Sequence, residues 1–278
     1  MFTDRKLVIA TKHSKETVIA PVLESGCGVK CIVPDDFDTD QLGTFSGEIE
    51  RQDDPLETAR KKCLLAIERT NCDLAVASEG SFGPHPSIIF IPADDELLLF
   101  VDKKNNLQIW VREISTNTNF SRKEIKSIHE LTDFAHSVQF PSHGLILRSS
   151  PFETVDLVKG IQDWDLLNQT FTRLITQYGT VHAETDMRAF CNPTRMNVIQ
   201  QAAFKLVDKL KSTCPQCAAP GFGITDRREG LPCEWCGLPT RSTLSFISTC
   251  QQCGYTQEDH YPNGKEKEDP TYCDYCNP

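Results

Sequence analysis

Four Cys-x-x-Cys pairs lie in the last 65 residues of the 278-residue chain and constrain its fold more than any other feature. Such a pair places two thiolates on a tight turn, from which both can reach one tetrahedral ion at about 2.3 Å, and a second pair completes the site. The spacing therefore predicts a double zinc-ribbon-like tail with two zinc ions bound by Cys214, Cys217, Cys233, Cys236, Cys250, Cys253, Cys273 and Cys276.

Both zinc sites should be structural, because four sulfur ligands leave no coordination position for water or substrate. The turn residues in CPQC, CEWCG, CQQCG and CDYCNP are typical of zinc knuckles and disfavour thioredoxin-type redox chemistry. Disulfides or buried free thiols are the alternative, which a cytoplasmic chain disfavours. We expect sequential pairing, the first pair with the second and the third with the fourth, over an interleaved arrangement, although the spacing permits both.

The charge and hydropathy of the chain limit the kinds of molecule that it is expected to bind. The net charge is −10 and the pI is near 5.2, and the tail carries five Lys/Arg against nine Asp/Glu, so nucleic-acid binding is disfavoured. The longest apolar runs are far shorter than the roughly 20 residues that cross a bilayer, and the N-terminus lacks a signal-peptide core. We therefore expect a cytoplasmic protein that does not bind membranes. A small anionic ligand is still compatible with the acidic chain, because a pocket needs only two or three local cations.

Residues 1–212 are predicted to form an α/β domain, a mixed sheet layered by helices, followed by the zinc-binding domain over 213–278. Apolar runs predict strands at 7–10, 29–33, 74–77, 87–91, 144–148 and 180–183, and a hairpin that turns near Asn105. Helical periodicity covers 14–25, 55–70, 123–137, 164–178 and 193–211.

The loop ATKHSK, residues 10–15, leaves the first strand and opens a helix. Ligands of open α/β sheets bind at the carboxyl ends of strands, and a helix N-terminus attracts anions. Thr11, Lys12 and Lys15 are therefore candidate ligand-binding residues. The alternative is an ordinary turn in which Ser14 caps the helix and the lysines are solvated.

Two further segments place carboxylates near strand ends or helix starts. Asp54, Pro55 and Glu57 form a capping-box pattern that explains all three residues without a function. In ASEGSFGPHP, residues 77–86, Glu79 follows a buried strand beside two glycines, which makes it a candidate catalytic or metal-binding carboxylate or else part of a turn.

The stretch HAETDMRAFCNPTRM, residues 182–196, is unusually rich in charge. Asn192 should cap the last helix, which places Thr194 and Arg195 in its first turn, where exposed N–H groups favour an anionic ligand. Upstream, carboxylates and a cation are candidate catalytic and ligand-binding residues: Glu184, Asp186 and Arg188. The alternative is a buried ion-pair network.

These segments carry a resemblance. The combination of ATKHSK, LGTFSGE, ASEGSFGPHP, ETDMRAFCNPTRM and CDYCNP resembles, over nearly the whole chain, an uncharacterised bacterial family known as domain of unknown function 6671. That resemblance implies no activity.

Residues 6 to about 90 and the last helix are also distantly similar to inosine and xanthosine triphosphate pyrophosphatases, although the loop lacks their Asn and no His precedes Arg195. This resemblance implies that Lys15 contacts a triphosphate, that Glu57 binds magnesium, that Glu79 is the strand-end carboxylate and that Thr194 and Arg195 contact the base.

The resemblance implies a metal-dependent hydrolase of a nucleotide-like phosphoanhydride, with Mg²⁺ or Mn²⁺ held by Glu57 and Glu79 and with Glu184 or Asp186 as a further ligand or base. The alternative is a non-catalytic module that binds a phosphorylated ligand and docks a protein partner through its zinc tail. Converging carboxylates would favour the enzyme, whereas a capping Glu57 and an ion-paired Glu184 would favour the module.

Overall fold

The structure is a computed structural model that describes residues 1–11, 13–34, 54–151 and 155–278. The candidate residue Lys12 and the LGTFSGE segment lie outside these ranges. The chain divides into two compact units, Met1–Val207 and Asp208–Pro278, each of which is described by itself.

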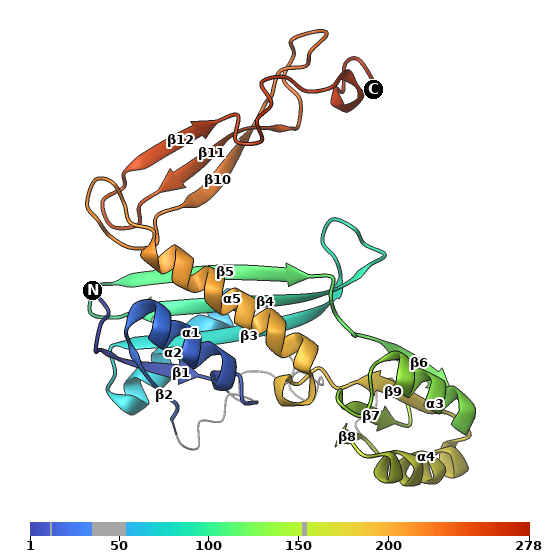
Figure 1. The fold of residues 1–278 in the computed structure, drawn as a ribbon. Helices are drawn as coiled ribbons and strands as arrows, with labels where there is room; N and C mark the ends of the chain where they lie inside the picture. Colours follow the sequence, from blue (N-terminus) through green and yellow to red (C-terminus); the bar gives the residue numbers. More distant parts are fainter. Residues whose placement is uncertain (12, 35–53, 152–154) are drawn as a thin grey trace. The chain divides into compact units, whose positions relative to one another are not determined.

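The first sheet of unit 1 has five strands in the order β2 (Lys30–Ile32), β1 (Lys6–Ala10), β3 (Leu74–Pro84), β4 (Pro92–Asp102) and β5 (Leu107–Ser115). Strand β1 pairs in parallel with β2 and β3, and β3, β4 and β5 pair antiparallel, so the sheet is mixed (Figure 1). Ala10 lies opposite Ala77. Strand β3 therefore continues past the end of β1, where it pairs with β4 as far as Pro84.

Three helices belong to this sheet: α1 (Glu16–Cys27), α2 (Pro55–Thr70) and α5 (Pro193–Lys211). Helix α2 buries small residues such as Ala59 and Cys63 against Val8, Ala77 and Leu99 on one face of the sheet. Helices α1 and α5 meet at Gly26, where an added Cβ would lie 2.5 Å from Cγ1 of Val207, so only glycine permits this approach.

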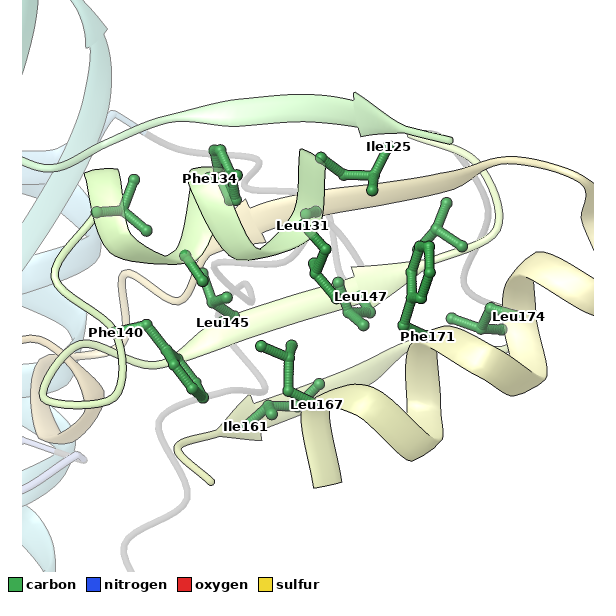
Figure 2. Close-up of a cluster of buried hydrophobic side chains, with 14 residues drawn as sticks. Ile125, Leu131, Phe134, Phe140, Leu145, Leu147, Ile161, Leu167, Phe171 and Leu174 are labelled. Atoms are coloured by element: carbon green, nitrogen blue, oxygen red, sulfur yellow. The ribbon is translucent and has the colours of Figure 1, made fainter. Parts of the chain in front are cut away.

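The second sheet of unit 1 is antiparallel, in the order β6 (Arg122–Ile125), β9 (Val181–Thr185), β7 (Leu145–Arg148) and β8 (Val158–Ile161). Helices α3 (Ile128–Ser137) and α4 (Trp164–Tyr178) cover one face of this sheet, because their apolar side chains and the alternate residues of the strands form one buried cluster (Figure 2). Unit 1 thus has a second hydrophobic core of its own.

Unit 2 is an antiparallel meander of three strands, β10 (Ile224–Glu229), β11 (Thr243–Thr249) and β12 (Thr256–His260), with β11 in the middle. Its buried cluster is small: Cys214, Ala219 and Cys250 with partly buried Phe222 and Tyr255.

The predicted fold class, a mixed α/β structure with a cysteine-rich tail, is confirmed. The helices predicted over 55–70, 164–178 and 193–211 begin and end where expected. The strand predicted at 87–91 is wrong, since these residues form the loop of the β3–β4 hairpin. Residues 123–125 of the helix predicted over 123–137 belong instead to strand β6. The prediction that Ser14 caps α1 is wrong. The N-cap residue is Lys15, and its side chain makes no capping hydrogen bond to the helix.

Candidate functional site

Two cysteine tetrads dominate unit 2. One consists of Cys214, Cys217, Cys250 and Cys253, and the other of Cys233, Cys236, Cys273 and Cys276. Within each tetrad the four sulfur atoms lie within 4.8 Å of one another, so each tetrad can hold one metal ion. The first cysteine of every pair is buried, whereas Cys217, Cys236 and Cys253 are exposed.

The pairing is interleaved, and the expected sequential pairing is wrong. Strand β10 connects the first Cys-x-x-Cys pair to the second, β11 connects the second to the third, and β12 follows the third. Because neighbouring strands run antiparallel, consecutive pairs lie at opposite ends of the sheet, and the first pair meets the third. The Sγ–Sγ distances between Cys217 and Cys250 and between Cys236 and Cys273 are both 3.6 Å.

The knuckles share one backbone turn. In each, the N–H of the residue after the second cysteine donates to the carbonyl of the first, as Gly237 does to Cys233 at 3.0 Å. The residues at this position in the first three knuckles, Ala218, Gly237 and Gly254, adopt positive φ. A backbone N–H also donates to the sulfur of Cys250 and thereby lowers the pKa of this thiol to about 7, which favours the thiolate that metal binding requires.

In unit 1, polar side chains gather on one face of β3 beyond the end of β1. Ser78, Gly80 and Phe82 alternate along β3 and share this face. The ammonium of buried Lys15, at the start of α1, donates to Ser78 Oγ at 3.0 Å. Buried Arg195, in the first turn of α5, lies with its guanidinium 5.0 Å from the Phe82 ring centre. The structure thus brings Lys15 and Arg195 to the same face of the sheet.

Arg195 is held in place by several partners. Its Nε donates to Glu96 Oε1 at 2.6 Å, and its Nη1 donates to the carbonyl of Met187. Gly80 makes this arrangement possible, because an added Cβ would lie 2.3 Å from Arg195 Nη2 and 2.4 Å from Glu96 Oε1. The glycine in ASEGSFGPHP therefore serves the close approach of an ion pair to the β3 backbone.

Sequence reasoning missed two carboxyl groups of this face, Asp94 and Glu96, which are both fully buried on β4. Among the described residues, neither oxygen of Asp94 has a hydrogen-bond partner, and neither does Glu96 Oε2. Burial and the neighbouring Glu96 carboxylate raise the pKa of Asp94 to about 8. This raised pKa favours the protonated, neutral form of Asp94 at neutral pH.

The buried charged side chains around Lys15 carry more positive than negative charge. Burial, followed by the charge of Arg195, lowers the pKa of Lys15 to about 8, so Lys15 is still mainly protonated at pH 7. On this face of β3, Lys15 and Arg195 are buried cations, and Glu96 is their buried counter-charge once Asp94 is neutral; the buried Lys62–Glu79 ion pair lies on the other face, toward α2. This edge of the sheet is consequently one charge more positive than negative.

The sequence predicted that Glu79 lies in a loop after the strand, and this placement is wrong. Glu79 lies inside β3, because β3 continues in its long hairpin with β4. The Glu79 carboxylate forms an ion pair with Lys62, a buried lysine of α2 that sequence reasoning also missed. Glu79 lines a cavity of about 230 Å³ at the start of α2, together with Asp54, Leu97, Trp110 and the ion-paired Asp95 and Arg112.

The turn between β1 and α1 has an unusual backbone. His13 and Ser14, two consecutive residues other than glycine, have φ of 72° and 60°. Such conformations are strained in L-residues and cluster at functional sites. The His13 ring lies 5.4 Å from the ring of Phe190, which precedes α5, and Thr11 is buried at the end of β1. The turns that lead into α1 and α5 therefore contact each other.

Asn192 and Thr194 hold the start of α5. The N–H of Arg195 donates to Asn192 Oδ1 at 3.0 Å, which is the predicted cap. Thr194 Oγ1 lies 2.9 Å from Nε2 of His143, a buried residue that no sequence signal singled out. These contacts orient the first turn of α5, from which Arg195 projects.

The other predicted carboxylates have structural partners. Glu57 lies in the first turn of α2, where Asp54 caps the helix, and pairs with Arg60. Glu184 lies on β9, 3.1 Å from Nε of Arg148. The structure therefore places Glu57 and Glu184 in separate ion pairs.

Asp186 and Arg188 join the strands of the second sheet to the turn before α5. The buried Asp186 carboxylate accepts from Arg188 Nε at 3.0 Å and from the N–H of Gly160 on β8 at 3.0 Å. The Arg188 guanidinium lies 4.8 Å from the Phe190 ring centre. The structure therefore places Asp186 and Arg188 in an ion pair with each other.

Within the described ranges, groups of three or more side chains able to hold a metal ion occur only at the two tetrads. A search of the same ranges finds no helix long and apolar enough to cross a membrane.

The fold and the tetrads define an α/β protein with a cysteine-rich tail in which two pairs of knuckles form tetrads able to hold metal ions. The chain belongs to the family described as domain of unknown function 6671, whose model matches residues 62–278. No curated protein matches the chain.

Solved structures with low similarity to the chain include two bacterial proteins. Protein VC0702 from Vibrio cholerae is 10% identical, with a TM-score of 0.33 over 74% of this chain and 94% of that chain. The hypothetical protein CT253 from Chlamydia trachomatis is 11% identical, with a TM-score of 0.22 over 64% of this chain and 98% of that chain.

Proposed function

We propose that unit 1 binds a small phosphorylated ligand where β1 and β3 meet the starts of α1 and α5. The observation that carries this proposal is that two buried cations, Lys15 and Arg195, share one face of β3, where Arg195 pairs with Glu96 and Lys15 donates to the uncharged hydroxyl of Ser78. An uncompensated buried positive charge is costly, and an anionic ligand would neutralise it. The strained turn at His13 and Ser14 leads into the N-terminus of α1 beside Lys15, and the positive end of a helix suits phosphate oxygens.

Ligand-induced stabilisation tests this proposal. Pyrophosphate, nucleoside monophosphates and nucleoside triphosphates would be added to the full chain, and the melting temperature would be measured. At least one should raise it, because a ligand that binds only the folded state stabilises that state. The Lys15→Gln variant should lose the shift, whereas Lys30→Gln, which removes an exposed lysine, should keep it. An identical shift in wild type and Lys15→Gln would contradict the proposal.

A metal-dependent hydrolase of a nucleotide-like phosphoanhydride is the second candidate. The observation that favours it is Glu79, a buried carboxylate on β3 that lines the 230 Å³ cavity at the start of α2. The described side chains there form no preassembled magnesium or manganese site. Phosphate release from nucleoside triphosphates, with and without Mg²⁺ or Mn²⁺, would test hydrolysis. Glu79→Gln should abolish any turnover, and a complete lack of product would leave ligand binding as the function of unit 1.

We further propose that both tetrads bind structural zinc. Four thiolates in a tetrahedral arrangement suit Zn²⁺, and the close Sγ–Sγ distances support this assignment. All 13 cysteines lie in the described ranges and are free thiols, a state that a reducing cytoplasm would maintain. Elemental analysis of protein purified without chelator should find two zinc ions per chain, and one or none would refute the assignment.

A further inference from the structure

The two tetrads share one backbone design but differ in the residues between their cysteines. In the first tetrad these residues are Pro-Gln and Gln-Gln, in CPQC and CQQC. In the second they are Glu-Trp and Asp-Tyr, in CEWC and CDYC. Each knuckle of the second tetrad therefore presents a carboxylate followed by an aromatic ring, and neither knuckle of the first does.

Because the pairing is interleaved, the two knuckles that carry Glu234, Trp235, Asp274 and Tyr275 belong to the same tetrad. The sulfur atoms of Cys233 and Cys276 lie 3.9 Å apart, and the N–H of Glu234 donates to the carbonyl of Glu268 at 3.0 Å. We call this surface the aromatic tip; its residues are Glu234, Trp235, Tyr272, Asp274 and Tyr275.

The aromatic side chains of the tip face solvent. Trp235 is 78% exposed and Tyr275 is 74% exposed, and Tyr272, in the short 3₁₀ helix η3 (Pro270–Tyr272), is also exposed. The metal site does not need these rings, because the first tetrad forms the same turns with glutamines. Exposed Trp and Tyr side chains that lie together are typical of binding surfaces.

We propose that the aromatic tip binds a basic segment of a partner protein, with lysine or arginine side chains against the rings of Trp235 and Tyr275. Aromatic faces attract cations, and the adjacent carboxylates of Glu234 and Asp274 add opposite charge. Arg241 already shows this chemistry, because its Nε donates to Asp274 at 3.0 Å in an exposed ion pair that a partner's guanidinium can replace. The same carboxylates repel nucleic-acid phosphates and anionic lipids.

This inference is independent of ligand binding by unit 1, but it rests on a metal ion in the second tetrad. Zinc content is therefore measured for every variant, so that loss of the metal is distinguished from loss of the surface.

The test is a titration of the full zinc-loaded chain with fluorescently labelled deca-arginine and deca-lysine peptides, followed by anisotropy. The Trp235→Gln/Tyr275→Gln double variant copies the side chains of the first tetrad, which its knuckles tolerate. It should weaken peptide binding about tenfold. Glu234→Gln/Asp274→Asn should weaken binding and reduce its salt dependence. The matched control, Gln216→Ala/Gln252→Ala in the first tetrad, should bind like wild type.

Three results would overturn the proposal. Equal peptide binding by wild type and Trp235→Gln/Tyr275→Gln, with two zinc ions in both, would show general attraction to an acidic chain. Tighter binding of oligothymidylate than of either peptide would assign the tip to nucleic acid. Absence of any binding by the zinc-loaded wild type would remove the tip as a site for basic segments.

Discussion

The buried ion pair between Arg195 and Glu96 requires a residue without a side chain at position 80. Gly80→Ala would push a Cβ into Arg195 and Glu96, which both lie closer than 2.5 Å to the added atom. We expect a loss of about 1–3 kcal/mol in the free energy of unfolding, as is typical of overpacked interiors. Urea denaturation measures this loss. Gly83→Ala, on the same strand, is the matched control, because no described heavy atom lies within 4 Å of its added Cβ. Equal stability of the two variants would refute the tight packing at Gly80.

Asp94 should make the stability of unit 1 fall as pH rises. Its pKa is about 8 in the folded chain, against an ordinary value of 3.8, because burial and Glu96 disfavour the ionised form. Between these values the folded state holds a proton that the unfolded state has released, so the free energy of unfolding decreases from about pH 4 to pH 8. Lys15 acts oppositely above pH 8, since its pKa is lowered to about 8 from 10.5 and the unfolded state then binds more protons.

The Asp94→Asn variant isolates this contribution. Its free energy of unfolding, measured by urea denaturation at several pH values, should decrease less between pH 5 and pH 8 than that of wild type. The difference between the two proteins should be largest at the alkaline end of this window. Parallel curves for the two proteins would show that Asp94 is ionised in the folded chain.

At the residue scale, sequence predicted the cations of the candidate site better than its carboxylates. Lys15 and Arg195 were predictable because each lies where a chain segment enters a helix. Asp94 and Glu96 gave no signal, since a charged residue before the apolar run at Leu97 reads as solvated. Only the register of β4 with β3 shows that they face Phe82 and Gly80 in the interior.

At the scale of elements, a capping residue identified the start of α2, and turn residues near β3 were misleading. Asp54 accepts hydrogen bonds from the first turn of α2, which begins at the predicted residue, whereas periodicity alone predicted the bounds of α4. Gly80, Gly83 and Pro84 indicated that a strand ended near Ala77, yet β3 runs to Pro84 because pairing with β4 continues. Tertiary pairing of this kind overrides local propensity.

The interleaved arrangement of the tetrads predicts which cysteine substitutions act together. The double variant Cys217→Ser/Cys253→Ser damages one tetrad, so it should retain one zinc ion per chain. Cys217→Ser/Cys236→Ser damages both tetrads and should retain neither ion. Elemental analysis of the two purified proteins distinguishes the arrangements, because sequential pairing predicts the opposite result for the two variants. Cys31→Ser, outside the tail, is the control and should keep both ions.

At the scale of the whole molecule, the folds of the two units are stabilised by different interactions. Unit 1 buries two extended hydrophobic clusters, one against α2 and the other beneath α3 and α4. The apolar cluster of unit 2 has three buried members, two of which are cysteines of the first tetrad. So few apolar side chains cannot offset the conformational entropy of about 70 residues, and we infer that unit 2 folds only with its metal ions.

Chelation should therefore unfold unit 2 and leave unit 1 folded. Metal binding to structural cysteine sites contributes about 10–16 kcal/mol in small zinc domains, and its removal is coupled to unfolding. Hydrogen exchange of the full chain, followed by mass spectrometry after treatment with a zinc chelator, should show lost protection in β10, β11 and β12. Protection in β3, β4 and β7 should persist, since their backbone hydrogen bonds lie over cores that contain no metal. Restoration of protection by added zinc is the control. Simultaneous loss of protection in β3 and β10 would show that the two units unfold as one, and that the zinc tail is required for the fold of unit 1.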